Sequence, residues 1–151
     1  MIEVIQGEGG INISEKKFLK KLRDITKKKD ILLIIDEVQT GIGRTGKWFA
    51  YQNFGIIPDI VTSAKGLGNG IPIGACMGNQ KVSKLFEPGS HGSTFGGNPF
   101  VSTISLEVLK IIKERNLLDH VNEMGKFFIN QLKDDLGNLK IVREIRGMGL
   151  M

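Results

Sequence analysis

The chain has 151 residues, of which 40% are hydrophobic and 25% charged, and this is the composition of one soluble globular domain. Much of the net charge of +5 comes from one Lys-rich stretch, residues 14–29, in which Phe18, Leu22 and Ile25 recur at helical spacing. We interpret its lysines as the solvated face of an amphipathic helix, with a phosphate-binding patch as the alternative, and expect no nucleic-acid partner.

The sequence also limits the compartment and the kinds of site. It contains no run of about 18 apolar residues, and its start lacks the basic and apolar segments of a signal peptide. We therefore expect no membrane association and a cytoplasmic location. The single cysteine, Cys76, excludes an internal disulfide and a multi-cysteine metal site, and no metal site is expected.

Short apolar runs predict the strands of an α/β fold. Three of them are continuous rather than alternating, which is typical of strands buried on both faces of a parallel sheet, and a fourth is similar. The basic helix, with Ser14 as N-cap, lies between the first two runs and predicts a β-α-β unit. The runs are 2–5 (IEVI), 31–36 (ILLIID), 59–64 (DIVTSA) and 71–78 (IPIGACMG).

The second half of the chain predicts helices. Asn98 and Pro99 combine a capping side chain with a proline at the first helical position. The helical pattern breaks near residues 115–116 and resumes as far as Gly137. The final stretch, LKIVREIRGMGLM (139–151), predicts a strand, a glycine-bearing turn and the start of another strand. Because both ends fall in predicted strands, we expect a piece of a longer protein.

One glycine-rich stretch, TGIGRTGKW (40–48), has the spacing of a phosphate-binding P-loop. A P-loop needs Ser or Thr directly after its lysine, because that hydroxyl binds magnesium, and Trp48 stands there instead. The acidic strand that ends at Asp36 also precedes the glycine-rich loop, whereas it follows the loop in P-loop enzymes. We therefore reject nucleotide hydrolysis.

Two ionisable residues stand at the ends of neighbouring predicted strands. Asp36 ends one apolar run and Lys65 follows the next, and ligands bind outside the carboxyl ends of such strands in open α/β sheets. A carboxylate at the end of a buried strand needs a cationic partner. From these residues alone, a structural ion pair and a functional pair are both open.

Longer stretches of sequence around Asp36 and Lys65 favour the functional pair over the structural ion pair. The stretch from Asp36 to Ala75 (DEVQTGIGRTGKWFAYQNFGIIPDIVTSAKGLGNGIPIGA) and HGSTFGGNP (91–99) resemble the class III pyridoxal-phosphate aminotransferases. The resemblance covers nearly the whole chain and implies the large domain of fold type I, an α/β fold with a mainly parallel sheet and flanking helices. It implies that residues 1–98 belong to the cofactor-binding large domain, that 99–137 form a helical connection, and that 138–151 begin a small C-terminal domain.

The resemblance also assigns roles to the DEVQ string and to one lysine. Asp36 matches the residue that holds the protonated pyridine nitrogen of pyridoxal 5'-phosphate, and Lys65 matches the lysine that carries the cofactor as a Schiff base and then moves the substrate proton. Val38 is expected against the ring and Gln39 at the phenolic oxygen, with Glu37 among the cofactor-binding residues.

Outside that string, three further residues are assigned by resemblance. Thr94 matches a residue that reaches the cofactor phosphate of the neighbouring subunit, and Ser93 is carried over as a substrate contact. Glu8 matches an acid near the substrate pocket. These roles imply a homodimeric parent enzyme with small amino-acid and 2-oxo-acid substrates.

Within the class, GIGRTG and HGSTFGGNP favour members that move an amino group from N2-acetylornithine to 2-oxoglutarate in arginine biosynthesis. Members that act on ornithine or 4-aminobutyrate are the alternatives. Family members are more than twice this length, so we expect this chain to carry the lysine half of the site and not to turn over alone. A catalytically inactive truncated product is the non-enzymatic alternative.

Overall fold

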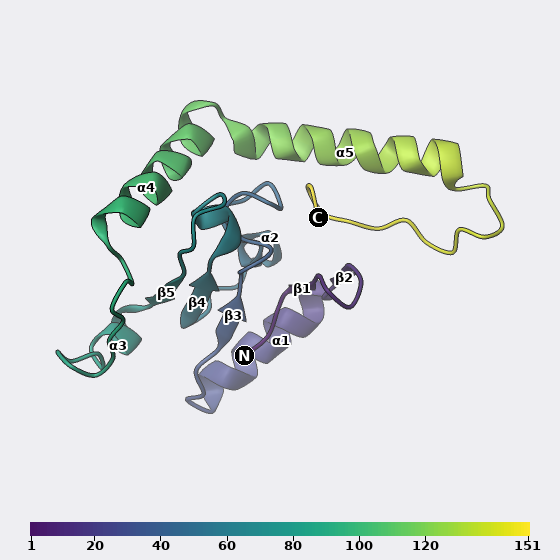
Figure 1. Cartoon of the computed structure of the whole chain (residues 1–151). Coiled ribbons are helices and arrows are strands. Elements are labelled where there is room, and N and C mark those ends of the chain that lie inside the picture. The colour runs from purple at the N-terminus through teal and green to yellow at the C-terminus, as the bar shows by residue number, and fades with distance from the viewer.

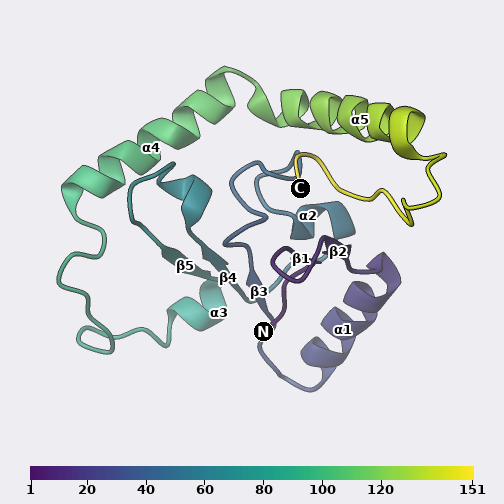
Figure 2. The same cartoon turned by 45° about the vertical axis from the view of Figure 1, so that its right-hand side comes forward.

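A three-stranded sheet forms the centre of the computed structural model, which describes all 151 residues and confirms the predicted α/β class (Figure 1). Strands β3 and β4 are parallel, with Asp36 opposite Thr62, and β5 runs antiparallel to β4 at the sheet's edge. In both cartoon views α1 lies on one side of the strands and the α4–α5 pair on the other (Figure 2). The strands are β3 (Ile34–Asp36), β4 (Ile60–Ser63) and β5 (Ala75–Gly78), in the order β3-β4-β5.

The first apolar run does not form the single strand that the sequence predicts. Ile2 makes one parallel bridge with Ile35, which retains the expected β-α-β relation. The chain then continues into a small antiparallel pair, β1 (Ile5–Gln6) with β2 (Asn12–Ile13). Sequence reasoning missed β2 because Asn12–Ile13 is too short to show a pattern.

Helix α1 (Lys16–Lys28) confirms the basic amphipathic helix. Ser14 is not its N-cap, because the Ser14 N–H donates to Val4 O at 3.0 Å and extends the β1–β2 pairing instead. Glu15 occupies the N-cap position without a side-chain hydrogen bond. Leu19 is fully buried whereas Phe18 is half exposed, so the buried stripe is offset from the predicted one.

The core lies between α1, the first strands and the segment that follows β3. Eight residues form one buried cluster, and each buried Leu, Ile or Phe contributes about 1.5–3 kcal/mol to folding. Part of the cluster comes from α2 (Tyr51–Phe54), a four-residue helix that the sequence pattern did not predict. The cluster consists of Val4, Ile5, Leu19, Leu33, Ile35, Ala50, Phe54 and Ile56.

One buried carboxylate ties α1 to the sheet. Asp59 accepts hydrogen bonds from the Arg23 guanidinium at 2.5 and 3.2 Å, from Leu33 N at 2.8 Å and from Asn79 Nδ2 at 2.9 Å. Asn79 in turn caps the short helix α3 (Gln80–Ser83) through a hydrogen bond from Val82 N. Three separate parts of the chain therefore meet at one side chain.

Two long helices follow, as predicted. Helix α4 (Pro99–Glu114) begins after Asn98, whose side chain accepts from Val101 N at 3.2 Å. The break falls at Asn116, which has left-handed backbone angles (φ 51°, ψ 38°), and α5 (Leu117–Leu136) ends one residue before the predicted limit. None of the helices has the length and apolar character needed to cross a membrane.

The predicted strand-turn-strand at the C-terminus is wrong. Residues 138–151 contain turns and irregular backbone but no strand. Most of their backbone hydrogen bonds are local, and the long-range one joins Leu150 N to Arg44 O at 3.0 Å. The apolar pattern of this tail found no neighbouring strand to pair with in this chain. Arg146 fastens the tail to β2 instead, through Ile11 O and Asn12 Oδ1.

Candidate active site

Asp36 and Lys65 lie at the carboxyl edge of the same parallel strand pair. Asp36 is the last residue of β3 and pairs with Thr62 of β4, and Lys65 follows three residues after Thr62. Lys65 opens the single 3-10 turn η1 (Lys65–Leu67). The expected strand ends are therefore confirmed. The carboxylate of Asp36 is oriented by Val38, whose backbone N–H donates to Asp36 Oδ1 at 2.9 Å.

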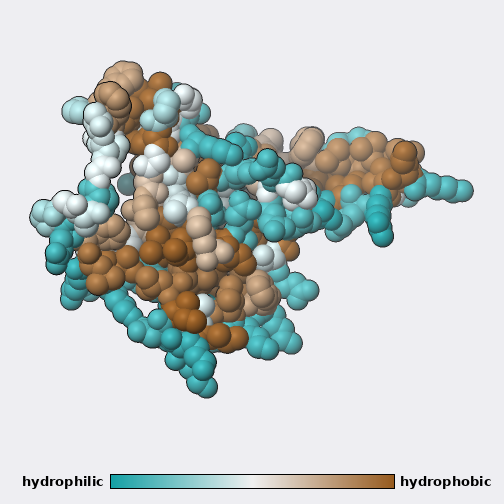
Figure 3. Space-filling model, turned by 60° about the horizontal axis from the view of Figure 1, so that its bottom comes forward, coloured by the Kyte–Doolittle hydropathy of each residue, from teal (hydrophilic) through white to brown (hydrophobic).

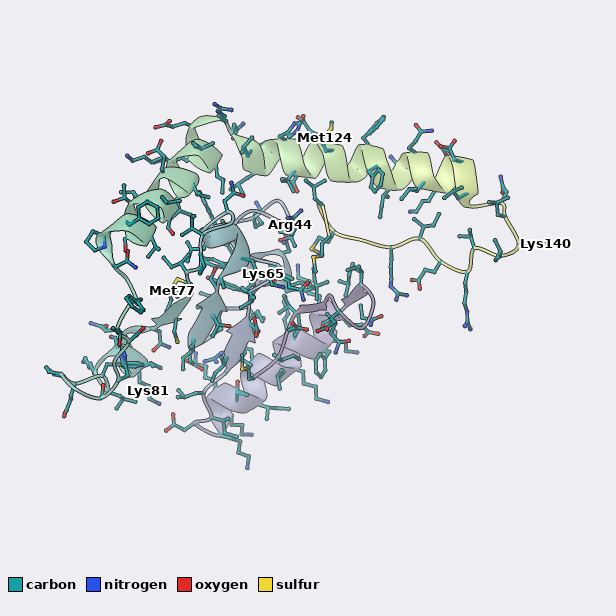
Figure 4. All side chains as sticks on the ribbon, in the orientation of Figure 1. Arg44, Lys65, Met77, Lys81, Met124 and Lys140 are labelled. Carbon is teal, nitrogen blue, oxygen red and sulfur yellow. The ribbon has the colours of Figure 1, made fainter.

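A cavity of about 530 Å³ adjoins Lys65. Its polar lining comes from Gln39, Arg44, Lys65 and Asn69, and its apolar wall comes from the facing sides of α4 and α5. Figure 4 shows Lys65 after the end of β4 and below the α4–α5 corner, and its side chain is exposed to solvent in this chain. The apolar lining residues are Ile42, Val108, Ile111, Ile112, Leu117, Leu118, Val121, Leu150 and Met151.

Backbone strain is concentrated at this cavity. Ile42 (φ 52°), Lys65 (φ 42°) and Asn69 (φ 46°) all have left-handed backbone angles, and all three line it. A non-glycine residue in this region costs about 1–3 kcal/mol and persists only where its surroundings hold it, and such residues cluster at functional sites. Ile42 carries the largest penalty because it is β-branched. The strain makes the cavity a candidate site independently of any motif.

Glu37 lies outside the cavity lining. Its side chain is fully buried, and the carboxylate accepts from Thr40 Oγ1 at 2.5 Å, Ala50 N at 2.9 Å and Tyr51 N at 2.8 Å. The side chain has no exposed surface and both of its oxygens are engaged within this chain, so it does not face the cavity, and a cofactor contact by Glu37 stays a prediction. Burial raises the pKa of Glu37 above its ordinary 4.5, the Asp36 charge adds to this, and the three hydrogen bonds only partly offset it.

Of the remaining predicted residues, one lines the cavity and the others lie outside its lining. Gln39 lines the cavity and packs so tightly against Gly7 that a side chain at Gly7 would collide with it. Glu8 is exposed in the adjoining β1–β2 turn, and neither Asp36 nor Val38 is part of the cavity lining. The structure thus brings Gln39 and Lys65 into one cavity, with Asp36 beside them through strand pairing.

Ser93 and Thr94 lie outside this group. Both are exposed in the long loop between α3 and α4, and neither lines the cavity. Ser93 Oγ accepts a hydrogen bond from Gly96 N at 2.9 Å, which closes a local turn. Within this chain, the loop therefore does not complete the site around Lys65.

Known proteins are similar to this chain over its whole length. The family model for class III aminotransferases matches residues 1–151, the whole chain. The chain belongs to the class III aminotransferases. Among curated family members, the acetylornithine aminotransferases of Aquifex aeolicus, Bacillus subtilis and Methanocaldococcus jannaschii are 53%, 48% and 46% identical to it. Each comparison covers all of this chain but only 38–39% of the relative, so the chain spans about two fifths of their length.

Solved structures of aminotransferases have the same fold. The ornithine aminotransferase of Toxoplasma gondii matches with a TM-score of 0.93 and 41% identity, over 99% of this chain and 35% of that one. The acetylornithine aminotransferase of Elizabethkingia anophelis matches with a TM-score of 0.92 and 36% identity, over 98% of this chain and 37% of that one. The fold is therefore that of an aminotransferase fragment.

Sequence reasoning on this aminotransferase chain missed the far wall of the cavity. Val108, Ile111 and Ile112 lie in a stretch for which the sequence predicts a helix, but a helix prediction does not reveal what the helix packs against. Asn69 carried a signal, since it stands in a glycine-rich loop and Asn tolerates left-handed backbone. For Ile42 no local pattern predicted the strained conformation.

Proposed function

We propose that this chain carries the lysine half of an aminotransferase active site. In the proposed reaction, pyridoxal 5'-phosphate is the cofactor and an amino group passes from N2-acetylornithine to 2-oxoglutarate. The observation that carries the proposal is the placement of Lys65 and Gln39 in one strained cavity, next to Asp36 on the paired strand. Membership of the class III aminotransferases supports it.

The residues present suit this cofactor. The Lys65 amine can bond covalently to its aldehyde, the Asp36 carboxylate can accept a hydrogen bond from its pyridine N–H, and the Gln39 amide can donate to its phenolic oxygen. The bound cofactor would supply an electron sink for negative charge at the substrate carbon that bears the transferred amino group. Asp36 is restrained for such a role, because Val38 N already fixes one of its oxygens.

Lys65 then has a second task, which is to remove the proton from the substrate carbon that bears the transferred amino group. In N2-acetylornithine this is the terminal δ-carbon, because the α-amino group is acetylated. The long, flexible side chain of Lys65 can reach both positions, and a positioned base typically contributes about 10²–10⁴-fold to the rate. The apolar residues of α4 and α5 form the opposite wall of the cavity. Val38, half-buried beside Asp36, is proposed to pack against the cofactor ring.

The identity of the amino donor rests on the relatives. The curated relatives given above, at 46–53% identity, are named acetylornithine aminotransferases, which favours N2-acetylornithine. Ornithine is the second candidate, because the T. gondii ornithine aminotransferase matches with a TM-score of 0.93. Glu8 is proposed as a substrate contact, since its turn is joined to Gln39 through Gly7.

The assembly that we propose is a homodimer. In it, Thr94 contacts the cofactor phosphate of the other subunit and Ser93 contacts substrate, which agrees with the exposed position of both residues in this chain. The hydroxyls and glycine amides of this loop suit phosphate oxygens. Cys76 is free, which suits a reducing compartment such as the cytoplasm.

Covalent labelling tests the proposal. The chain is mixed with pyridoxal 5'-phosphate, reduced with borohydride, and digested for peptide mass spectrometry. We expect a single label on Lys65, which is lost in Lys65→Ala and retained in Lys47→Ala, an exposed lysine in the nearby glycine-rich loop. Labels scattered over the surface lysines in the unaltered chain would contradict the proposal.

The same sample tests turnover. Because the chain spans only about two fifths of its relatives, we expect cofactor binding without sustained transfer from N2-acetylornithine, ornithine or 4-aminobutyrate to 2-oxoglutarate. Glutamate production is the measurement. A steady rate from the purified 151-residue chain would show that this half of the site is sufficient, and its dependence on the donor would then identify the substrate.

A further inference from the structure

Glu37 stands between two residues of the proposed site, and its own side chain is buried away from the cavity. It follows Asp36 directly, and its own N–H donates to Thr62 O at 2.9 Å, which extends the β3–β4 ladder by one residue. Two residues later, Gln39 enters the cavity wall. A displacement of Glu37 therefore moves the residues on both sides of it.

The Glu37 carboxylate closes a loop. Residues 38–49 leave the sheet at Glu37 and return to the core at Ala50, and this one side chain holds both ends. Near the start of the loop it accepts from the Thr40 hydroxyl at 2.5 Å, and at the return it accepts from Ala50 N at 2.9 Å and Tyr51 N at 2.8 Å. The free N–H groups at the start of α2 are satisfied in this way, since α2 has no side-chain cap of its own.

The surroundings of the carboxylate are closely packed. Thr40 is 1% exposed and Ala50 is fully buried. The Gly41 N–H donates to Glu37 O at 2.9 Å, and a side chain at Gly41 would come within 2.8 Å of that same oxygen. Water therefore cannot replace a lost hydrogen bond while the loop is closed. The loss of such a bond would favour the open loop, in which water reaches the unpaired group.

This loop supplies one wall of the cavity. Gln39, Ile42 and Arg44 come from it, and Ile42 is held in its strained left-handed conformation. Strain of that kind needs fixed anchors on both sides. On the far side the loop is joined to α5 and the tail, through Asn122 Nδ2 to Gly46 O at 3.1 Å and Leu150 N to Arg44 O at 3.0 Å. Glu37 provides the anchor on the sheet side.

We propose that Glu37 is a positioning residue, whose buried carboxylate holds the 38–49 loop closed so that Asp36 and Gln39 face the bound cofactor. The inference rests on the proposed function, since it takes Asp36 and Gln39 as cofactor contacts. It also has a part that is independent of any cofactor, namely that the loop stays closed only while Glu37 bridges its ends.

Trypsin tests the loop in the absence of cofactor. Arg44 and Lys47 are exposed within it, and cleavage after them requires the loop to open. When opening is fast, the rate of proteolysis is proportional to the population of the open loop. Glu37→Gln weakens the hydrogen bonds that close the loop, so we expect it to speed cleavage at these two sites by about tenfold or more. Thr40→Val, which removes one donor, should have a smaller effect at the same sites.

Asp59→Asn is the matched control. Asp59 is another buried carboxylate with hydrogen bonds to distant parts of the chain, but none of them involves the loop. We expect this variant to lower the global stability without favouring cleavage after Arg44 and Lys47 over cleavage after Lys140 in the tail. If Glu37→Gln and Thr40→Val also leave the two loop sites protected, the proposal is overturned.

The visible absorption band of bound pyridoxal 5'-phosphate tests the positioning. In Glu37→Gln and Thr40→Val we expect weaker binding, by about tenfold in the former, and a band shifted towards that of the free cofactor. An unchanged band and affinity in folded variants would reduce Glu37 to a purely structural role.

If the unaltered chain binds no cofactor, the proposed function fails while the trypsin result still decides the role of Glu37 in the loop. If Glu37→Gln does not fold, Thr40→Val decides both measurements.

Discussion

At the residue scale, two buried carboxylates differ in how burial affects their protonation. Burial by itself raises the pKa of both. For Glu37 the neighbouring Asp36 charge adds to this, and the pKa stays raised. For Asp59 the hydrogen bond and charge of Arg23, with the bonds from Leu33 N and Asn79, outweigh burial and lower the pKa below 3.8. A cation within hydrogen-bonding distance makes the difference.

These directions predict how stability depends on pH. Folded Asp59 binds its proton less readily than the unfolded chain does, so its contribution is complete above pH 3.8 and is lost as the pH falls through the lowered value. Folded Glu37 binds its proton more readily, so the free energy of unfolding declines as the pH rises from 4.5 through the raised value.

Urea unfolding at a series of pH values checks both directions. At neutral pH, Asp59→Asn should cost about 3 kcal/mol or more, because it leaves a partly buried guanidinium without its partner. The difference from the unaltered chain should shrink below pH 3.8. Glu37→Gln should remove the decline above pH 4.5. A difference for Asp59→Asn that is the same at every pH would contradict the assigned direction.

Much of the site at this scale could be predicted from sequence. Asp36 and Lys65 fall where their strand ends were expected, since a strand end is a local property of the apolar run. The role of Glu37 could not be predicted, because its hydrogen-bond donors at Ala50 and Tyr51 lie 13 and 14 residues away. An acid after a strand looks the same in sequence whether it faces a ligand or the core.

At the element scale, local signals determined the helices better than the strands. Asn98 and Pro99 mark the start of α4 as predicted, because a cap and a fixed proline φ act within one turn. The strands are shorter than their apolar runs, and the run at residues 139–142 forms none at all. A strand exists only where a neighbour supplies hydrogen bonds, and that neighbour is set by the whole fold.

The cap of α4 gives a prediction at this scale. Asn98→Ala removes the hydrogen bond to Val101 N and should lower the free energy of unfolding by about 1 kcal/mol, whereas Asn98→Asp should keep most of it. Chemical denaturation of both variants measures the difference. Equal stability of Asn98→Ala and the unaltered chain would mean that Pro99 alone determines the start of the helix.

At the scale of the whole molecule, the chain exposes large apolar side chains. Figure 3 shows hydrophobic surface over much of the body and along the projecting arm that carries the end of α5. On α5, Phe127 is 62% and Phe128 60% exposed, and Phe95 in the long loop is 80% exposed. Soluble monomers rarely expose contiguous apolar surface of this kind, so these areas are suited to contacts with further protein.

We therefore expect the purified chain to associate as its concentration rises. Size-exclusion chromatography with light scattering measures the mass. Replacing Phe127 and Phe128 by Ser should reduce association, because both are exposed on one helix, whereas Phe18→Ser on α1 should change it less. A monomer at all accessible concentrations would show that these surfaces do not attract one another.

The corner at Asn116 gives the molecule a lever. Helix α5, with 20 residues, is about 30 Å long, and its first turns form part of the wall opposite Lys65. A tilt of about 10° at the corner would carry the far end of the helix through about 5 Å but would move Val121, near the pivot, by only about 1 Å. A large displacement at the outer end of α5 thus corresponds to a small one at the cavity wall. The cavity can therefore keep its shape when the outer end of the helix moves.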